Sequence, residues 1–548
     1  MTINNNNSTH KLVNLSHILL STIVNNLKDN IDKICFSLVC KRWFDDRNRY
    51  LLFDTDSLYC VYKDSSRITL NSYRSLILES LDKKKQRTVY VTNDTSYILV
   101  DHVIDYDSIE SMDEIDQNIV EVTETSDMQK REDSDQLSTK LYDLISKSNV
   151  TSIVGCQTLK HRIPMNITSL EFGYHFDEQL FKGCFPPNLK RLKFLGGFNQ
   201  VIEVGVLPDT LESLEIYTLN QILEPGVLPT SLKILIVTGK TPNNYLKVGS
   251  LPSNLEEFIH NCSEVSIDPE VLPNSLITLH NVPLSWMKSI KYLENLRSLV
   301  LTDGSGLLDL SDLPKSLTTL HIINSLTLQS ALPTSIRHLS LANSVYDIDE
   351  LFPDRTLYHL ESLKEMAFKQ ESLDGLDIKK LSLHYYYDEN SDTLRVIPFG
   401  VETLEISVWF AFDIKQDSLP SSLKTLNVHN MNCFKRPGII PNSVNHLIIG
   451  EDKDIVLQEG ILPDSVQNIE LKAAYFPTTK LVDNISFEDD ENHKCSIRKL
   501  DDQYYILFGK QTHRRYFMAG LLHKSMFEER FDVIKMLSGK DIRLYHLP

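Results

Sequence analysis

Cysteines, histidines and glycine-rich loops are the features of this sequence that could carry chemistry. The eight cysteines are scattered through the 548 residues and none forms a CxxC pair, so neither a zinc site nor a redox motif is indicated. Gly304-Ser305-Gly306 lacks the third glycine of a dinucleotide-binding loop, and Gly509-Lys510-Gln511-Thr512 lacks the spacing of a phosphate-binding loop. HExxH and GxSxG motifs are absent as well. The sequence therefore predicts a protein that is not an enzyme and that uses no cofactor or metal.

The charge and the apolar patterning limit the classes of partner. The formal net charge is −18, which argues against nucleic acid, because phosphate recognition needs a basic surface. Sparse cysteines fit a reducing compartment. The N-terminus lacks the regions of a signal peptide, and no apolar stretch approaches the roughly 18 residues of a membrane span. These features predict a protein of the cytoplasm, with the nucleus as the alternative, that contacts no membrane.

A repeated pattern dominates the chain between residues 160 and 480. Each unit begins with a proline, and apolar residues follow three, six and eight positions later, as in Pro208, Leu211, Leu214 and Ile216. Prolines that fit this template stand at positions 164, 186, 208, 229, 252, 273, 314, 333, 398, 420, 441 and 463. Most intervals are 21–23 residues, and the longer gaps hold units that lack the proline. About fifteen units result.

The spacing within a unit indicates a short strand and a short return. The last two apolar positions alternate, which is the period of a β-strand. A strand this short is unstable alone, but stacked strands form a parallel ladder whose apolar columns make one continuous core. Only about ten residues separate successive strands, too few for a long crossover helix. We therefore expect a mainly β solenoid with one parallel sheet of about fifteen units.

Two stretches of the unit form a more specific motif. Phe198-Asn199-Gln200-Val201-Ile202 is followed by Gly205-Val206-Leu207-Pro208-Asp209-Thr210-Leu211, and residues 219–232 hold a similar copy. These segments resemble FNIP repeats, a branch of the leucine-rich repeat class with the signature F-N-x-x-I and then G-x-L-P-x-S-L-x-x-L. Later units lose the F-N-x-x-I part, so their return segments should differ in shape. The resemblance implies a leucine-rich-repeat-like fold and a protein-binding role, and it implies no particular ligand.

Residues between the strand leucines should point to the concave face of such a solenoid. Apolar groups that face solvent in a groove usually mark a binding patch, although a shallow groove could also bury them against their neighbours. The histidines at these positions fall on different columns and mostly on different repeats, so they do not indicate a metal site. The candidate partner-binding residues are Ile234, Ile236, Ile259, Val300, His321 and His338.

Residues 12–53 follow a helical pattern instead. Apolar residues recur at helical spacing from Leu15 to Leu27, and the segment ends in Ser37-Leu38-Val39-Cys40-Lys41-Arg42-Trp43. This resembles a degenerate F-box, with Leu15-Ser16 in place of that family's opening Leu-Pro, and it implies docking to a Skp-type linker protein. The candidate docking residues are Leu19, Ile23, Val39 and Trp43. The alternative is a helical cap over the first repeats.

Three further segments flank the repeats. Residues 54–100 contain alternating runs that predict a small strand-rich segment. Residues 101–136 are acidic and poor in aromatics, which predicts a disordered linker or loop. Residues 481–548 are expected to form a C-terminal cap of two strands and a basic helical tail.

Two functions fit this organisation. The chain could be a substrate-recognition adaptor of a cullin-type ubiquitin ligase, with the F-box-like helices on a Skp-type linker and the repeat groove on the protein to be modified. Alternatively, it is a non-enzymatic interaction scaffold without a ubiquitin role. Whether residues 12–53 expose apolar side chains distinguishes the two functions.

Overall fold

The computed structural model divides the chain into two units, Lys85–Tyr386 and Met1–Lys84 with Tyr387–Pro548. The residues that the structure describes are 14–27, 29–54, 67–68, 70–82, 88–92, 103–125, 133–239, 241–242, 244–261, 267–303, 306–341, 344–367, 373–384, 396–407, 414–429, 431–450, 460–472, 482–488, 494–511 and 516–527.

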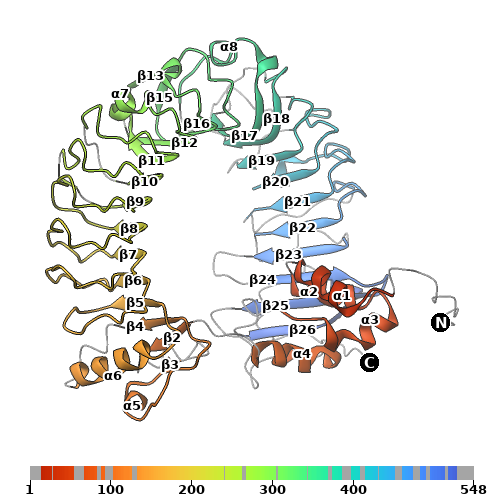
Figure 1. The fold of residues 1–548 in the computed structure, drawn as a ribbon. Helices are drawn as coiled ribbons and strands as arrows, with labels where there is room; N and C mark the ends of the chain where they lie inside the picture. The colour runs from red at the N-terminus through yellow and green to blue at the C-terminus, as the bar shows by residue number, and fades with distance from the viewer. Residues whose placement is uncertain are drawn as a thin grey trace. The chain divides into compact units, whose positions relative to one another are not determined.

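The unit Lys85–Tyr386 is a ladder of short parallel strands with loops on the outer side (Figure 1). Its strands are β2 (Thr88–Val91), β4 (Glu121–Glu124), β5 (Ser152–Cys156), β6 (Ser169–Phe172), β7 (Arg191–Phe194), β8 (Ser213–Ile216), β9 (Ile234–Val237), β10 (Glu257–His260), β11 (Thr278–Pro283), β12 (Ser298–Asp303), β14 (Thr319–Ile322), β16 (His338–Leu341), β17 (His359–Ala367) and β18 (Asp377–His384). Short β3 (Val103–Ile104) pairs with β2. The predicted β-solenoid is confirmed. It includes the two sequence repeats that lack the proline, which form β12 and β18.

The apolar columns hold this ladder together. Leu214 in β8 lies opposite Leu235 in β9, and the whole strand pair is in phase. Leu211, Leu214 and Ile216 are at most 1% exposed. Burying one such side chain contributes roughly 2 kcal/mol, but each column is covered only by the same column in the units above and below. Stability therefore belongs to the stack and not to a single unit.

In most of the described repeats a residue with left-handed backbone conformation starts the turn into the strand. Gly205, three residues before the repeat proline, has a φ of 78°. A Cβ at Gly205 would meet nothing within 4 Å, so this glycine is needed for its backbone conformation and not for space. Ser330 and Asp417 occupy the same position in other units and also have positive φ values, of 71° and 68°.

Aromatic stacking closes the return segments of the first repeats. Phe194 stacks on Phe198 within its own unit, with ring centroids 4.1 Å apart, and on Phe172 of the preceding unit at 5.1 Å. Asn220 donates its side-chain amide to the Oδ1 atom of Asn199 in the preceding unit, at 3.0 Å. The F-N-x-x-I segment therefore links neighbouring repeats by ring stacking and amide hydrogen bonds.

Later return segments differ in shape, as their loss of that motif predicts. A second, two-stranded parallel sheet forms from β13 (Gly306–Asp309) and β15 (Leu326–Gln329). Short helical turns fill other returns: η4 (Leu284–Trp286), α7 (Met287–Ile290), η5 (Leu310–Asp312), α8 (Ile348–Leu351) and η6 (Arg355–Leu357).

The acidic segment 101–136 corrects the prediction of disorder. Its described part, residues 103–125, contains α5 (Tyr106–Ile109) and strand β4, which pairs with both β2 and β5. Buried apolar side chains recur among the acidic residues: Ile104, Tyr106, Ile109, Ile115, Ile119 and Val122. These side chains supply the apolar burial that composition alone underestimates. Helix α6 (Ser134–Ser146) follows this segment. Because β2, β4 and β5 pair in parallel, the ladder begins well before residue 160.

The other unit combines the last repeats with both ends of the sequence. Parallel strands β19 (Thr403–Ser407), β20 (Thr425–Val428), β21 (His446–Ile449), β22 (Asn468–Leu471) and β23 (Asn484–Glu488) lead into antiparallel β24 (Lys494–Lys499), β25 (Tyr504–Gln511) and β26 (Tyr516–His523). Its other elements are α1 (His17–Asn25), α2 (Asn30–Ser37), α3 (Lys41–Asp45), η1 (Arg47–Arg49), β1 (Arg67–Ile68), α4 (Asn71–Asp82), η7 (Met431–Cys433) and η8 (Lys524–Phe527).

Two predictions for these flanking segments hold only in part. Residues 54–100 contain strands β1 and β2, but residues 71–82 form a helix whose apolar side chains Tyr73, Leu76 and Ile77 are buried. Residues 516–523, predicted to begin a helical tail, form β26, because pairing with β25 outweighs the local helical pattern. The rest of that tail, residues 528–548, lies outside the described residues.

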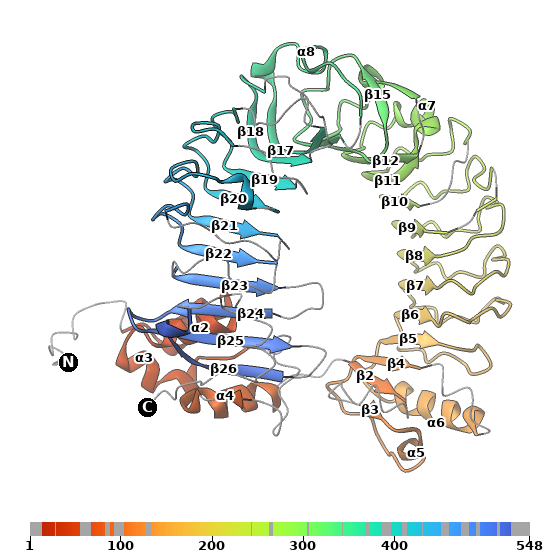
Figure 2. The same ribbon diagram turned by 180° about the vertical axis from the view of Figure 1, so that it is seen from behind.

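The N-terminal helices pack on the C-terminal strands, and both figures show them side by side (Figure 2). Phe53 stacks on Phe508 at 6.4 Å. Arg498 donates from its Nε atom to Asp32 at 2.8 Å and forms an ion pair with Asp29 at 3.3 Å. The expectation of a cap over the first repeats is therefore corrected: the helices cover the last strands, whose antiparallel pairing offers a broad apolar face.

A histidine interrupts one core column. His260 ends β10 at the position where other repeats place Ile216 or Val237, and its side chain is fully buried. Its ring lies 4.8 Å from that of Trp286 and 5.7 Å from that of Tyr245. Burial lowers the pKa of His260 to about 4. The folded chain therefore holds a neutral imidazole.

This burial predicts an acid-sensitive stability that one substitution removes. Above the unfolded pKa of about 6.5 both states are neutral and stability is full; as pH falls toward 4, only the unfolded state takes up the proton. His260→Leu should abolish a loss of about 2 kcal/mol between pH 7 and pH 5, measured by urea unfolding. An identical pH dependence in the variant and the wild type would contradict this account.

Candidate binding surfaces

The inner face of Lys85–Tyr386 carries a row of strand residues in register. Ile236 lies opposite Ile259, and Ile259 lies opposite His280 on the next strand. Val300 on β12 and His321 on β14 lie opposite each other and extend this face past a register irregularity between β11 and β12. Neighbouring strands are about 4.8 Å apart, so these side chains are in contact range. The structure therefore brings most of the predicted partner-binding residues into one band.

The predicted partner-binding residues differ in how deeply they are buried. Ile234, Ile236 and Ile259 are half-buried, so part of each side chain faces solvent. Val300 is only 8% exposed, which corrects its assignment: its neighbours cover it. His338 is exposed and lies in the neighbouring column, which also contains Ile234; it is opposite Thr319, and its Nδ1 atom is 3.0 Å from the hydroxyl of Ser362. The alternative prediction was that neighbouring residues bury the apolar side chains of a shallow groove. It holds for Val300 among the four apolar candidates.

The charges on this face are paired in part. Lys193 lies between Glu171 and Glu215, with Nζ–carboxylate distances of 3.6 and 3.4 Å. The apolar band begins on β9, where Ile236 lies opposite Glu215 of β8. His280 Nε2 is 2.8 Å from the hydroxyl of Ser298, and burial, together with the nearby His321, lowers the pKa of His280. In the described part of the chain, no group of three acidic, histidine or cysteine side chains is placed to hold a metal.

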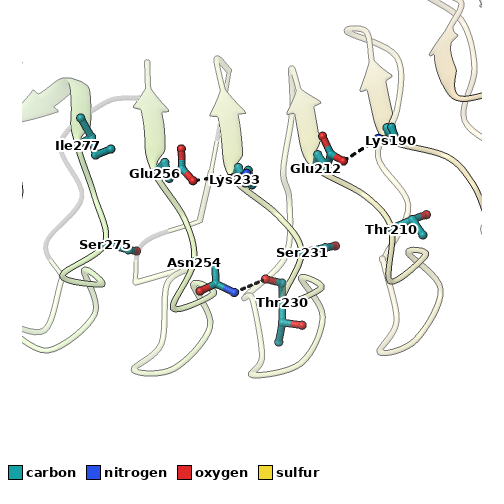
Figure 3. Close-up of a pocket in the computed structure, with 10 residues that line it drawn as sticks. All are labelled: Lys190, Thr210, Glu212, Thr230, Ser231, Lys233, Asn254, Glu256, Ser275 and Ile277. Carbon is teal, nitrogen blue, oxygen red and sulfur yellow. Dashed lines mark hydrogen bonds and ion pairs between the residues drawn. The ribbon is translucent and has the colours of Figure 1, made fainter.

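A shallow groove of 810 Å³ follows the residues just before the strands (Figure 3). Lys190 pairs with Glu212 at 3.0 Å, and Lys233 pairs with Glu256 at 3.7 Å. These four residues stand four positions after successive repeat prolines, so alternating charge at one repeat position was the signal that sequence reasoning missed. Exposed pairs like these contribute little stability, but they make this edge of the ladder polar.

The N-terminal helices expose a second apolar surface. In α1, Leu20 and Val24 are buried, whereas Leu19 is 51% and Ile23 is 38% exposed. Val39, after α2, is 67% exposed. Ile18, which sequence reasoning did not select, is 79% exposed. Here the pattern could have shown it, because Ile18 lies on the helical face opposite the buried pair.

Trp43 does not belong to this surface. It is 7% exposed and stacks on Phe36 with ring centroids 4.5 Å apart. Its carbonyl accepts a hydrogen bond from the Tyr50 hydroxyl at 2.8 Å. The prediction that Trp43 docks a partner is corrected: the indole fills the core between the helices.

None of the described helices is long and apolar enough to cross a membrane.

The stacked parallel ladder with its short returns defines a leucine-rich-repeat-like solenoid. The FNIP repeat family model matches residues 157–194, 176–218, 220–259, 410–452 and 434–473, so FNIP repeats are present in both units. These matches include the quoted Phe198 and Pro208 motif.

Among the solved structures that this chain resembles, two illustrate how low the sequence identity is. The solved structure of CroV588, described as a novel circular leucine-rich repeat protein, is 19% identical over 68% of this chain, with a TM-score of 0.41. YopM from Yersinia enterocolitica is 18% identical over 65% of this chain, with a TM-score of 0.28. This chain spans 62% of the first and 65% of the second. No curated protein matches the sequence.

Proposed function

We propose that this chain is a protein-binding repeat protein whose inner face in Lys85–Tyr386 recognises the partner. The observation that carries the proposal is the cluster of half-buried Ile236 and Ile259, which lie opposite each other, and of Ile234 in the neighbouring column of the same face. Apolar groups fixed on a solvent-facing surface can bury further area against a partner with little loss of conformational entropy. The paired charges beside them provide a polar rim.

We further propose that the N-terminal helices dock a Skp-type linker, which would make the chain a substrate-recognition adaptor of a cullin-type ubiquitin ligase. The exposed Ile18, Leu19 and Ile23 support this function, because a cap alone would gain nothing from leaving them in water. Such an adaptor contributes proximity and orientation and forms no bond itself.

A plain interaction scaffold is the second candidate function. The packing of Phe53 and Arg498 supports it, since the same helices already stabilise the last strands. The two candidates differ in one respect: only the adaptor uses the outward face of α1.

The first test replaces the inner apolar band. Ile236→Asp with Ile259→Asp should reduce the recovery of specifically bound proteins at least about tenfold in quantitative affinity enrichment, because each charge would need desolvation at the interface. Ile222→Asp is the matched control, since Ile222 is 45% exposed on a return segment. The double variant should remain folded but melt below the wild type, because its two new carboxylates lie opposite each other and beside Glu215, whereas Ile222→Asp should melt near the wild type. Unchanged recovery by the folded double variant would contradict the proposed surface.

The second test addresses the linker. Leu19→Lys with Ile23→Lys should weaken binding to a purified Skp-type protein at least about tenfold and leave the melting temperature unchanged, because both side chains already face solvent. Val201→Lys serves as the control, since Val201 is 59% exposed in a return segment. A wild-type chain that fails to bind the linker at roughly 10 μM would exclude the adaptor and leave the scaffold.

A further inference from the structure

A carboxylate stands in the core of the ladder near its beginning. Glu124, the last residue of β4, lies opposite the fully buried Val91 of β2. On the following strands, β5 and β6, this column of core positions continues with Cys156 and Phe172, which pair with each other and are also fully buried. Glu124 itself is only 8% exposed. A glutamate at a position that neighbouring strands fill with apolar side chains costs stability and therefore needs another explanation.

The surroundings satisfy only part of this carboxylate. The Tyr142 hydroxyl and the backbone N–H of Gln157 donate hydrogen bonds to Glu124. Among the described residues, the Oε1 atom of Glu124 has no hydrogen-bond partner. Burial raises the pKa of Glu124 to about 7, against the opposing effect of the two donors. The Tyr142 hydroxyl also lies 3.4 Å from the Cys156 sulfur, so the tyrosine is held in place by both neighbours.

A pocket of 420 Å³ adjoins Glu124. One wall is α6, which presents Ser134, Ser138 and Tyr142 at four-residue spacing along a single helical face. The other wall comes from the turns that follow β5 and β6. The acidic and basic side chains that line the pocket are Glu124, Asp135, Asp177, Glu178, Lys160 and His175. The lining therefore favours a positively charged occupant.

The lining acids have defined roles. Glu178 accepts from the Thr158 hydroxyl at 2.6 Å and from the Leu159 amide at 2.9 Å, so it fixes the loop that forms the wall. Asp135 is mostly exposed at the mouth, 4.0 Å from the Lys160 ammonium. Only Glu124 combines deep burial with an oxygen that lacks a donor.

We propose that this pocket binds a primary ammonium group, with the Glu124 carboxylate as its counter-ion and the Tyr142 ring as its apolar wall. A cation provides the missing donor to Oε1 and offsets the desolvation of the buried charge. The Oε1 atom is covered in the ligand-free chain, so binding includes a side-chain movement at the pocket floor. This site is independent of the protein partner proposed for the inner face.

Two sources could supply such a group, a lysine side chain of a protein and a free alkylamine. The volume of 420 Å³ admits either, since small-molecule sites begin at about 300 Å³. Two probes of the same single charge separate them by isothermal titration calorimetry on the full chain at pH 8: Nα-acetyl-lysinamide, which mimics a lysine side chain, and n-butylamine, a free alkylamine. Tighter binding of the first assigns a protein side chain, and tighter binding of the second assigns a free amine.

The decisive comparison uses Glu124→Gln, which keeps the shape and removes the charge. We expect saturable millimolar binding of at least one probe to the wild type and at least about tenfold weaker binding to the variant. Glu203→Gln, an exposed glutamate on a return segment, should bind like the wild type. Glu124→Gln should melt at or above the wild-type temperature, because the buried charge is gone.

Two results would overturn the proposal. One is the absence of saturable binding of both probes to the folded wild-type chain. The other is equal affinity in the wild type and Glu124→Gln. If Glu124→Gln melts lower than the wild type, the wild-type affinity for the probes is compared at pH 8 and pH 5.5 instead. Equal affinity at both pH values likewise overturns the site, because the probes keep their charge whereas the Glu124 carboxyl, with a pKa of about 7, loses its charge.

Discussion

The mutual burial of leucine columns is the interaction on which the rest of this structure depends. A unit with one four-residue strand cannot enclose its own apolar side chains, so Leu214 is covered by Leu235 and by Leu192 on either side. This arrangement fixes the strand register and commits alternate positions to the core. The positions between them are left to vary, and this freedom lets a repetitive core carry a non-repetitive inner surface.

The repeats were predictable because their signal is local and periodic. Proline phase and leucine spacing identified nearly every strand of the middle of the chain. The ends were not predictable in the same way. Arg498 and Asp32 lie far apart in sequence, and their ion pair leaves no periodic trace. In residues 101–136 the acidic composition concealed Ile109 and Val122, each fully buried, because composition averages over spacing.

For the candidate surfaces, the sequence predicted which face a side chain lies on but not how deeply it is buried. Strand alternation placed Ile236 and Ile259 correctly on the inner face, whereas the burial of Val300 and Trp43 depends on neighbours that the sequence does not reveal. Glu124 was missed for a related reason. Its strand lies inside the segment expected to be disordered, so its place in a core column became visible only with the register of β2 and β4.

The most direct test of this account is residue-resolved amide hydrogen exchange on Leu235→Asp, compared with the wild type. A charge in the shared column should remove protection from β8 and β10 together with β9, because each strand is stabilised mainly by its neighbours. The account predicts a joint loss that diminishes with distance along the ladder. Loss of protection confined to β9, with β8 and β10 unchanged, would contradict it.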